Sequence, residues 1–329
     1  MIPMQTRAAV RTLIIVFLLA SMGGLLYAYV LSIPAPVAVP TALAVAIELC
    51  LYVAAVLEPV RAWLQARLRP PALAAWMTAS ALLPYCLYSI PAGTFDTRLC
   101  IVLAAAAGAL SFWYVVFPRR AAVDVLFVVF VAAVLLSPLF AAIYTPPAPR
   151  LPLGILGQSA WTRLAFLAAL SIARMEVKGV GLWPDRREWA AGFLHFAFFL
   201  PVGALLGWAV RFASFHLRPM PWWQMLALAA GTFLGMLWVV ALREEFFFRG
   251  MLQEWFERWL RSGWLGLAAA SVLFGLVHLP FRGFPNWRFA LLAAVAGLFY
   301  GRAYQATRSV RAAMVTHALV NTTWRILFY

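Results

Sequence analysis

Charged residues are scarce in this sequence. They make up 11% of its 329 residues, whereas hydrophobic residues make up 65%. A soluble domain is about half apolar and about a quarter charged, so this composition excludes an ordinary soluble protein. Apolar runs of about 20 residues recur along the chain, and each can cross a bilayer core of about 30 Å. The composition predicts a polytopic membrane protein whose main partner is the lipid bilayer.

Acidic residues and cysteines are also few. The 11 Asp and Glu are outnumbered by 26 Lys and Arg, which gives a formal net charge of +15. Because the basic residues stand between apolar runs, they do not form the basic face that nucleic-acid binding requires. Nearly all of them are arginine, which suggests a GC-rich bacterial genome. The three cysteines lie in or beside separate apolar runs without CxxC spacing, so we expect neither a disulfide nor a cysteine metal site.

The apolar runs predict an all-α fold, a polytopic transmembrane helical bundle of about 11 spans. The first run is too long for a signal peptide and lacks a small-residue cleavage pattern, so we expect a retained span. Most arginines fall in loops on the side of the N-terminus, which predicts a cytoplasmic N-terminus in a bacterial inner membrane. The expected spans lie at about residues 10–32, 36–57, 71–92, 99–117, 122–143, 155–177, 191–211, 223–258, 264–281, 288–306 and 310–328.

A proline-rich stretch at residues 144–152 predicts a boundary between two parts of different polarity. The part before it, residues 1–150, is an N-terminal transmembrane region of about five helices with no assigned function. The part after it, residues 151–329, gathers most of the intramembrane charges. Glu48 in the second span and Asp124 at the start of the fifth are exceptions. An acidic residue in lipid is a functional candidate by default, and Glu48 has no evident partner in the sequence.

Two adjacent carboxylates interrupt the eighth apolar run. Glu245 and Arg249 stand at i and i+4 and can pair on one helical face, while Glu244 is turned by about 100° and can point elsewhere. Burying an unpaired charge costs several kcal/mol, so such a cluster must be compensated or used. The alternative is a helix end at the membrane interface with snorkelling charges.

Two histidines lie in later apolar runs. His278 follows Phe274 by four residues, and His317 precedes Asn321 by four, so each pair shares a helical face. A lone intramembrane histidine is usually a satisfied packing residue, but two of them with an amide and a glutamate pair favour a site. If the chain turns near residues 262–263, Glu245 and His278 are nearly equally far from the turn and lie at a similar height.

A glutamate and a histidine at one height can share a water molecule. The carboxylate, or the carboxylate with the imidazole, removes a proton, and the water attacks an amide carbonyl. His317 and Asn321 offer donors on one face for the resulting oxyanion. The same residues allow a metal alternative, in which His278, His317 and Glu244 bind Zn²⁺ with one open position. The zinc peptidase motif HExxH is absent, so no cofactor is expected.

In these motifs the chain resembles the CPBP intramembrane protease family, also called the Abi or CAAX-protease-like family. That family includes the type II CAAX prenyl endopeptidases, or Ras-converting enzymes. Its pattern is EExxxR, FxxxH and HxxxN on successive membrane helices, and the specific match covers about residues 240–321. The corresponding residues here are Glu244, Glu245 and Arg249, then Phe274 and His278, then His317 and Asn321.

The resemblance implies a glutamic-type intramembrane endopeptidase that works without metal on a peptide or membrane-anchored protein. By that resemblance Glu244 and His278 activate the water, His317 and Asn321 form the oxyanion site, and the second glutamate and the arginine support the arrangement. In layout the chain also resembles the CAAX-protease-related proteins of bacterial exosortase sorting systems, which would imply cleavage near the C-terminal anchor of exported proteins. The resemblance implies that residues 151–329 form a CPBP-like intramembrane protease core, and the first 150 residues have no counterpart in it.

Two functions of other classes use the same residues. A non-catalytic immunity or assembly factor would keep the fold and use the cavity for binding, but it would have little reason to retain all the motif residues. A transporter would relay protons through the glutamates and histidines. Transporters often have paired repeats and broken helices in both halves, whereas the polar residues here lie in one half. Peptide hydrolysis is therefore the leading hypothesis.

Overall fold

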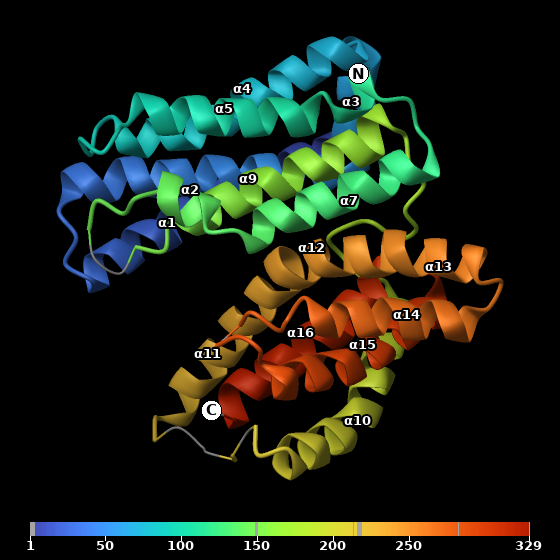
Figure 1. The fold of residues 1–329 in the computed structure, drawn as a ribbon. Helices are drawn as coiled ribbons and strands as arrows, with labels where there is room; N and C mark the ends of the chain where they lie inside the picture. Colours follow the sequence, from blue (N-terminus) through green and yellow to red (C-terminus); the bar gives the residue numbers. More distant parts are fainter. Residues whose placement is uncertain (1–3, 149–150, 213, 216–218, 282, 329) are drawn as a thin grey trace. The chain divides into compact units, whose positions relative to one another are not determined.

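The computed structural model describes residues 4–148, 151–212, 214–215, 219–281 and 283–328. Throughout these residues the regular structure is helical, and it forms two compact units, Met1–Glu176 and Val177–Tyr329 (Figure 1). Five helices are long and apolar enough to cross a membrane: Arg7–Val30, Ala35–Val56, Gly154–Ile172, Arg186–Ala209 and Trp222–Trp259. The predicted helical membrane bundle is confirmed, while the number of spans stays a prediction.

Unit 1 is built from helices that fall at the predicted apolar runs, with one addition. The addition is α3 (Glu58–Arg67), a short helix between the second and third predicted spans; Pro59 lies in its first turn, and its Leu64 side chain is buried. The helices of this unit are α1 (Met4–Val30), α2 (Ala35–Val56), α3 (Glu58–Arg67), α4 (Pro70–Ser89), α5 (Thr97–Ser111), α6 (Trp113–Val116), α7 (Ala121–Leu136), α8 (Leu139–Ile143) and α9 (Gly154–Leu167), which continues as the π-helix η1 (Ala168–Ile172).

A buried ion pair lies inside unit 1. Nε of Arg163 on α9 lies 2.9 Å from Oε1 of Glu48 on α2, and both side chains are almost completely excluded from solvent. Nη1 donates to the Ser80 hydroxyl and Nη2 to the Ser80 carbonyl, each at 2.8 Å. All three guanidinium nitrogens are therefore bonded. Glu48, which had no evident partner in the sequence, is the structural counterion of Arg163.

The boundary between the units differs from the sequence prediction. The sequence places it after residue 150, which lies outside the described residues, whereas the compact units divide after Glu176. The reason is α9, which packs among the helices of unit 1. Besides the Arg163 ion pair, the Trp161 indole on α9 donates to the Val131 carbonyl at 3.1 Å. The predicted sixth span therefore belongs with the first five.

Unit 2 contains one long helix and four others. The long helix runs without a break from Trp222 to Trp259 and is composed of α11 (Trp222–Gly235), η2 (Met236–Ala241), α12 (Leu242–Glu245), η3 (Phe246–Gln253) and α13 (Glu254–Trp259). The others are α10 (Arg186–Ala209), α14 (Gly263–Leu276), α15 (Trp287–Thr307) and α16 (Val310–Leu327). α15 packs against α10, α14 and α16, so it lies at the centre of this unit.

The predicted hairpin between the long helix and α14 is confirmed. Ser262 caps α14, with its hydroxyl accepting from the Leu265 N–H, and the two helices run antiparallel. A Cβ at Gly266 would lie 2.5 Å from the Glu257 backbone nitrogen, so glycine is needed where the helices touch. Further along, the Phe248 and Phe274 rings are 5.0 Å apart. Counted from this contact, Glu245 lies three residues before Phe248 and His278 four residues after Phe274, so both are about one turn further from the hairpin turn.

Candidate active site

The acidic pair lies where the long helix changes its geometry. The four residues of α12 stand between two π-helical stretches, η2 and η3. π-Helical turns are rare and occur often at functional sites, because the wider turn redirects side chains from the regular α-helical faces. Glu244 and Glu245 thus project from a short α-helical segment with irregular geometry on both sides.

Glu245 is completely buried and holds two partners. Its Oε2 lies 2.9 Å from Nε of Arg249, one turn further along, and its Oε1 lies 2.6 Å from Nδ1 of His317 on α16. The predicted pairing with Arg249 is confirmed. Because a carboxylate only accepts hydrogen bonds, the contact places a proton on Nδ1 of His317. Glu245 therefore fixes both an arginine and the orientation of a histidine ring.

Glu244 has a different environment. Its side chain is 21% exposed, its Oε1 lies 3.6 Å from Arg243, and its Oε2 lies 3.8 Å from Nε2 of His317. At these distances the carboxylate makes no direct hydrogen bond, but it stands beside the imidazole. The two glutamates thus approach opposite nitrogens of one histidine, and only Glu244 retains access to water.

Aromatic rings enclose His317. The Tyr300 ring from α15 stacks on the imidazole, with centroids 4.6 Å apart and an interplanar angle of 13°. Phe274 from α14 meets the imidazole edge-on at 5.8 Å and also lies 5.3 Å from the Arg249 guanidinium carbon. The phenylalanine of the FxxxH pattern therefore packs against the histidine and arginine of the other two motifs.

His278 lies in the turn that follows α14. Its Nδ1 donates to the Phe274 carbonyl at 2.6 Å, so a neutral ring leaves the Nε2 lone pair available. Its ring contacts are with Phe274, Phe281 and Phe289. Among the described residues His278 makes no hydrogen bond with Glu244, and it is His317 that contacts the carboxylates. The sequence predicts that Glu244 and His278 share a water molecule, which requires no direct contact between the two side chains, so this pairing stays a prediction.

Asn321 lies one turn beyond His317 on α16, as the i, i+4 spacing predicts. Its side chain is partly buried, and Nδ2 lies 3.7 Å from the Met236 sulfur at the start of η2. A thioether is a weak acceptor, so the amide is available to a stronger one. The amide and the His317 ring therefore belong to the same helix and face the segment that carries the glutamates.

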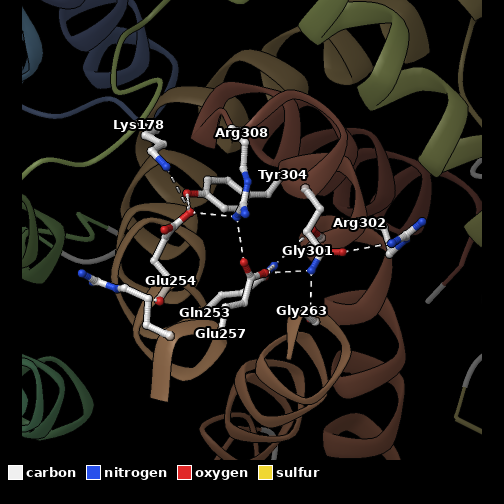
Figure 2. A network of polar contacts seen from close by, with 11 residues as sticks. Lys178, Gln253, Glu254, Glu257, Gly263, Gly301, Arg302, Tyr304 and Arg308 are labelled. Atoms are coloured by element: carbon white, nitrogen blue, oxygen red, sulfur yellow. Dashed lines mark hydrogen bonds and ion pairs between the residues drawn. The ribbon is translucent and has the colours of Figure 1, made fainter. Parts of the chain in front are cut away.

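A second polar network fixes the far end of the hairpin (Figure 2). Glu257 on α13 accepts from Arg308 at 2.7 Å and from Gln305 at 2.8 Å, and Gln305 also donates to the Gly263 carbonyl. The hydrogen bond with Glu257 raises the pKa of Arg308. Glu254 accepts from the Tyr304 hydroxyl at 2.6 Å. These contacts join the end of α15 to the helices that carry the acidic pair and Phe274.

The residues named for the metal alternative do not gather into one ligand set. His317 uses Nδ1 for Glu245, and the His278 ring lies among phenylalanines. Over the described part of the chain, no group of three or more His, Cys, Asp or Glu side chains has the arrangement of a metal site.

Some neighbours of the motifs were not expected from the sequence. Tyr300 belongs to no motif, yet it stacks on His317. Gly297, one turn earlier on α15, allows α14 to pack closely, because a Cβ there would lie 3.2 Å from the Ser271 Cβ. The only signal in the sequence was the Gly297–Gly301 spacing, which indicates close helix packing but no chemistry.

The fold and this cluster define a helical membrane protein with buried acid–histidine contacts between its helices. Residues 223–323 match the model of a family described as type II CAAX prenyl endopeptidase Rce1-like. The matched segment contains all three motifs, and it confirms the resemblance to the CAAX protease family that the motifs indicated. The match lies within unit 2. No curated protein and no solved structure matched the chain significantly.

Proposed function

We propose that this protein is an intramembrane endopeptidase that hydrolyses a peptide bond of a membrane-associated substrate. The family match supports a CAAX-protease-type function in general terms. The observation that carries the proposal is the pair of carboxylates on α12 that approach both nitrogens of His317, in a unit whose interior is otherwise largely apolar. Such a cluster is costly in a membrane and is retained where it serves a function.

Glu244 is the general base in this proposal. It is the carboxylate without a short ion pair, and its 21% exposure allows a water molecule to reach it. Glu245 is unsuited to this role, because Arg249 and His317 already occupy its two oxygens. Glu244 takes a proton from the water while the water oxygen attacks the amide carbonyl. The same carboxyl group later delivers this proton to the leaving amine.

His278 assists this step from the end of α14. The Phe274 carbonyl holds its Nδ1 proton, so Nε2 of the neutral ring can accept a hydrogen bond from the same water. The hairpin register, which brings His278 level with Glu245, supports this role. Apo geometry need not show the final contact, because catalytic hydrogen bonds often tighten only when substrate is bound.

His317 and Asn321 stabilise the oxyanion. The Asn321 amide has only a sulfur acceptor and can turn to a developing negative charge. Nδ1–H of His317 donates a hydrogen bond to Glu245, so Nε2 can donate as well only when both ring nitrogens carry protons. Glu245, Arg249 and Tyr300 hold this ring in place and act as positioning residues.

The substrate class is a peptide or membrane-anchored protein in a bacterial inner membrane, with the N-terminus of the enzyme in the cytoplasm. The proposed mechanism requires no metal. Inhibition by 1,10-phenanthroline that zinc reverses would instead favour a mechanism with Zn²⁺ on His278, His317 and Glu244.

The test compares protein termini in cells that carry the wild-type gene with termini in cells that carry Glu244→Ala. Quantitative mass spectrometry of new N- and C-termini in the membrane fraction detects cleavage even when the substrate is unidentified. We expect at least one cleavage product to disappear in Glu244→Ala, since loss of a general base lowers turnover by about 10²–10⁴-fold. Glu176→Ala removes an exposed glutamate outside the site and is the matched control.

The result also separates the competing functions. Identical termini in wild-type and Glu244→Ala cells, with equal amounts of folded protein, would contradict the proposal and favour a non-catalytic immunity or assembly factor. Proton uptake into vesicles that depends on Glu244 would instead indicate a transporter. Purified variants must insert and melt like wild type for these outcomes to be compared.

A further inference from the structure

A cavity of about 340 Å³ opens in unit 1 where α3 leads into α4 and η1 ends. Three arginines line it: Arg67, Arg69 and Arg174. No acidic residue belongs to its described lining. A cavity whose charges all have one sign attracts a counterion, and its walls raise the potential inside it.

The cavity is held in shape by a direct link between its walls. The Gln65 amide on α3 donates to the Ser171 carbonyl at 3.2 Å, at the end of η1. α3 has the character of an interfacial helix: Leu64 is buried, while Trp63 is 51% exposed. Tryptophan at that exposure is typical of the level of lipid headgroups. We infer from these residues that α3 lies at the level of the lipid headgroups, which would place the cavity near the membrane surface.

The polar groups of this cavity have unused hydrogen-bonding capacity. Within the described part of the chain, the three arginines make no ion pair, and Arg67 contacts only the Trp63 ring, at 5.1 Å. The Ser171 side chain is 4% exposed, and its hydroxyl has no hydrogen-bond partner among the same residues. A buried hydroxyl without a partner is rare in folded proteins, and Ser171 belongs to the same lining as the three arginines. An anion with several oxygens would satisfy them together.

The remaining lining is apolar. Leu68, Pro70 and Leu73 form another part of the wall. A free inorganic anion cannot bury apolar atoms against such a surface, whereas the glycerol and first methylene groups of a lipid can. Basic pockets between membrane helices are known to bind the headgroups of anionic lipids.

We propose that this cavity binds the phosphate group of an anionic phospholipid, with the guanidinium groups of Arg67, Arg69 and Arg174 as donors. The site lies in unit 1, outside the segment that matches the protease family, and is independent of the proposed catalytic reaction. It assigns a lipid-binding role to a region that the motifs leave without a function.

The backbone at Arg174 provides a clean test. Arg174 has a φ of +51°, in the left-handed region that glycine adopts more readily. Arg174→Gly therefore removes the guanidinium while relieving the backbone, so it should fold at least as well as wild type. Arg261, with a φ of +50° after α13 in unit 2, gives the matched control Arg261→Gly. Both variants lose one exposed arginine at the same backbone conformation.

The experiment uses the purified full-length chain in detergent, with lipid added and counted by native mass spectrometry. We expect wild type to retain one phosphatidylglycerol at lower concentrations than phosphatidylcholine. Arg174→Gly should raise the Kd for that phosphatidylglycerol about fivefold, the effect of one arginine near a charged headgroup. Arg261→Gly should leave it unchanged. Arg69→Gln, at a position that makes no cap hydrogen bond, should repeat the loss if Arg174→Gly proves unstable.

Three results would overturn the proposal. The first is equal phosphatidylglycerol binding by wild type, Arg174→Gly and Arg69→Gln. The second is equal retention of phosphatidylcholine and phosphatidylglycerol, because the site is proposed for net negative charge. The third is displacement of phosphatidylglycerol by soluble glycerol phosphate at equal concentration, which would assign the cavity to a water-soluble phosphate ester.

Discussion

The two units each bury an Arg–Glu pair, and the pairs differ in what surrounds them. In unit 1, Glu48 engages only Arg163, and Ser80 satisfies the other two guanidinium nitrogens. In unit 2, Nη1 and Nη2 of Arg249 have no partner among the described residues. The carboxylate of Glu245 contacts His317 as well.

This difference separates a structural ion pair from the proposed active site. We call the Glu48–Arg163 pair closed, because all three guanidinium nitrogens are bonded and, over the residues that the structure describes, no second carboxylate or histidine contacts the pair. The Glu245–Arg249 pair leads to His317 and then to Glu244, whose side chain is partly exposed. Both pairs meet the rule that intramembrane acids are functional candidates. We therefore distinguish the two pairs by the hydrogen bonds that their carboxylates and guanidinium groups make with neighbouring side chains.

The largest effect we expect on stability is from breaking the closed pair. Glu48→Ala leaves the Arg163 guanidinium buried without a counterion and should cost about 3–5 kcal/mol of unfolding free energy. Denaturant unfolding of the detergent-solubilised protein measures this loss. The double variant Glu48→Leu with Arg163→Met should recover much of it, because apolar residues of similar volume often replace a buried pair without loss. A loss below about 1 kcal/mol in Glu48→Ala would place the pair in a hydrated environment and refute this assignment.

A smaller effect, confined to the open site, is expected at Asn321. Asn321→Ala should lower the cleavage rate by about 10²–10³-fold, the usual loss for one oxyanion donor, with an unchanged melting temperature. The assay follows the cleavage product identified from the membrane fraction. Asn286→Ala is the comparison for stability: Asn286 caps α15, so its loss should cost about 1 kcal/mol and lower the melting temperature, unlike Asn321→Ala. If Asn321→Ala cleaves at the wild-type rate, the oxyanion role is wrong.

The sequence predicted what depends on local spacing. The i, i+4 pairing of Glu245 with Arg249 and the hairpin turn before α14 follow from helical geometry, and both are present. The helices at the apolar runs follow from hydrophobicity. The family resemblance rests on three motifs that are short and local, and it is confirmed over residues 223–323.

Contacts between distant segments were not predictable in this way. Arg163 and Glu48 are 115 residues apart in the chain, so helical spacing could not identify Arg163 as the partner of Glu48. The same partnership draws α9 into unit 1 and moves the boundary past the prolines. Tyr300 reaches His317 only because α15 packs beside α16, and spacing within a helix carries no information about such stacking. For the same reason the sequence could not show that His317, and not His278, contacts the two carboxylates.

The most direct test compares the two adjacent glutamates in purified protein, by rate and by melting temperature together. Our account predicts that Glu244→Ala abolishes cleavage and melts like wild type, because its carboxylate makes no short contact. Glu245→Ala should instead melt at a lower temperature, since it strands Arg249 and releases His317. Active Glu244→Ala enzyme, or equal destabilisation by both substitutions, would contradict the division of one carboxylate for chemistry and one for support.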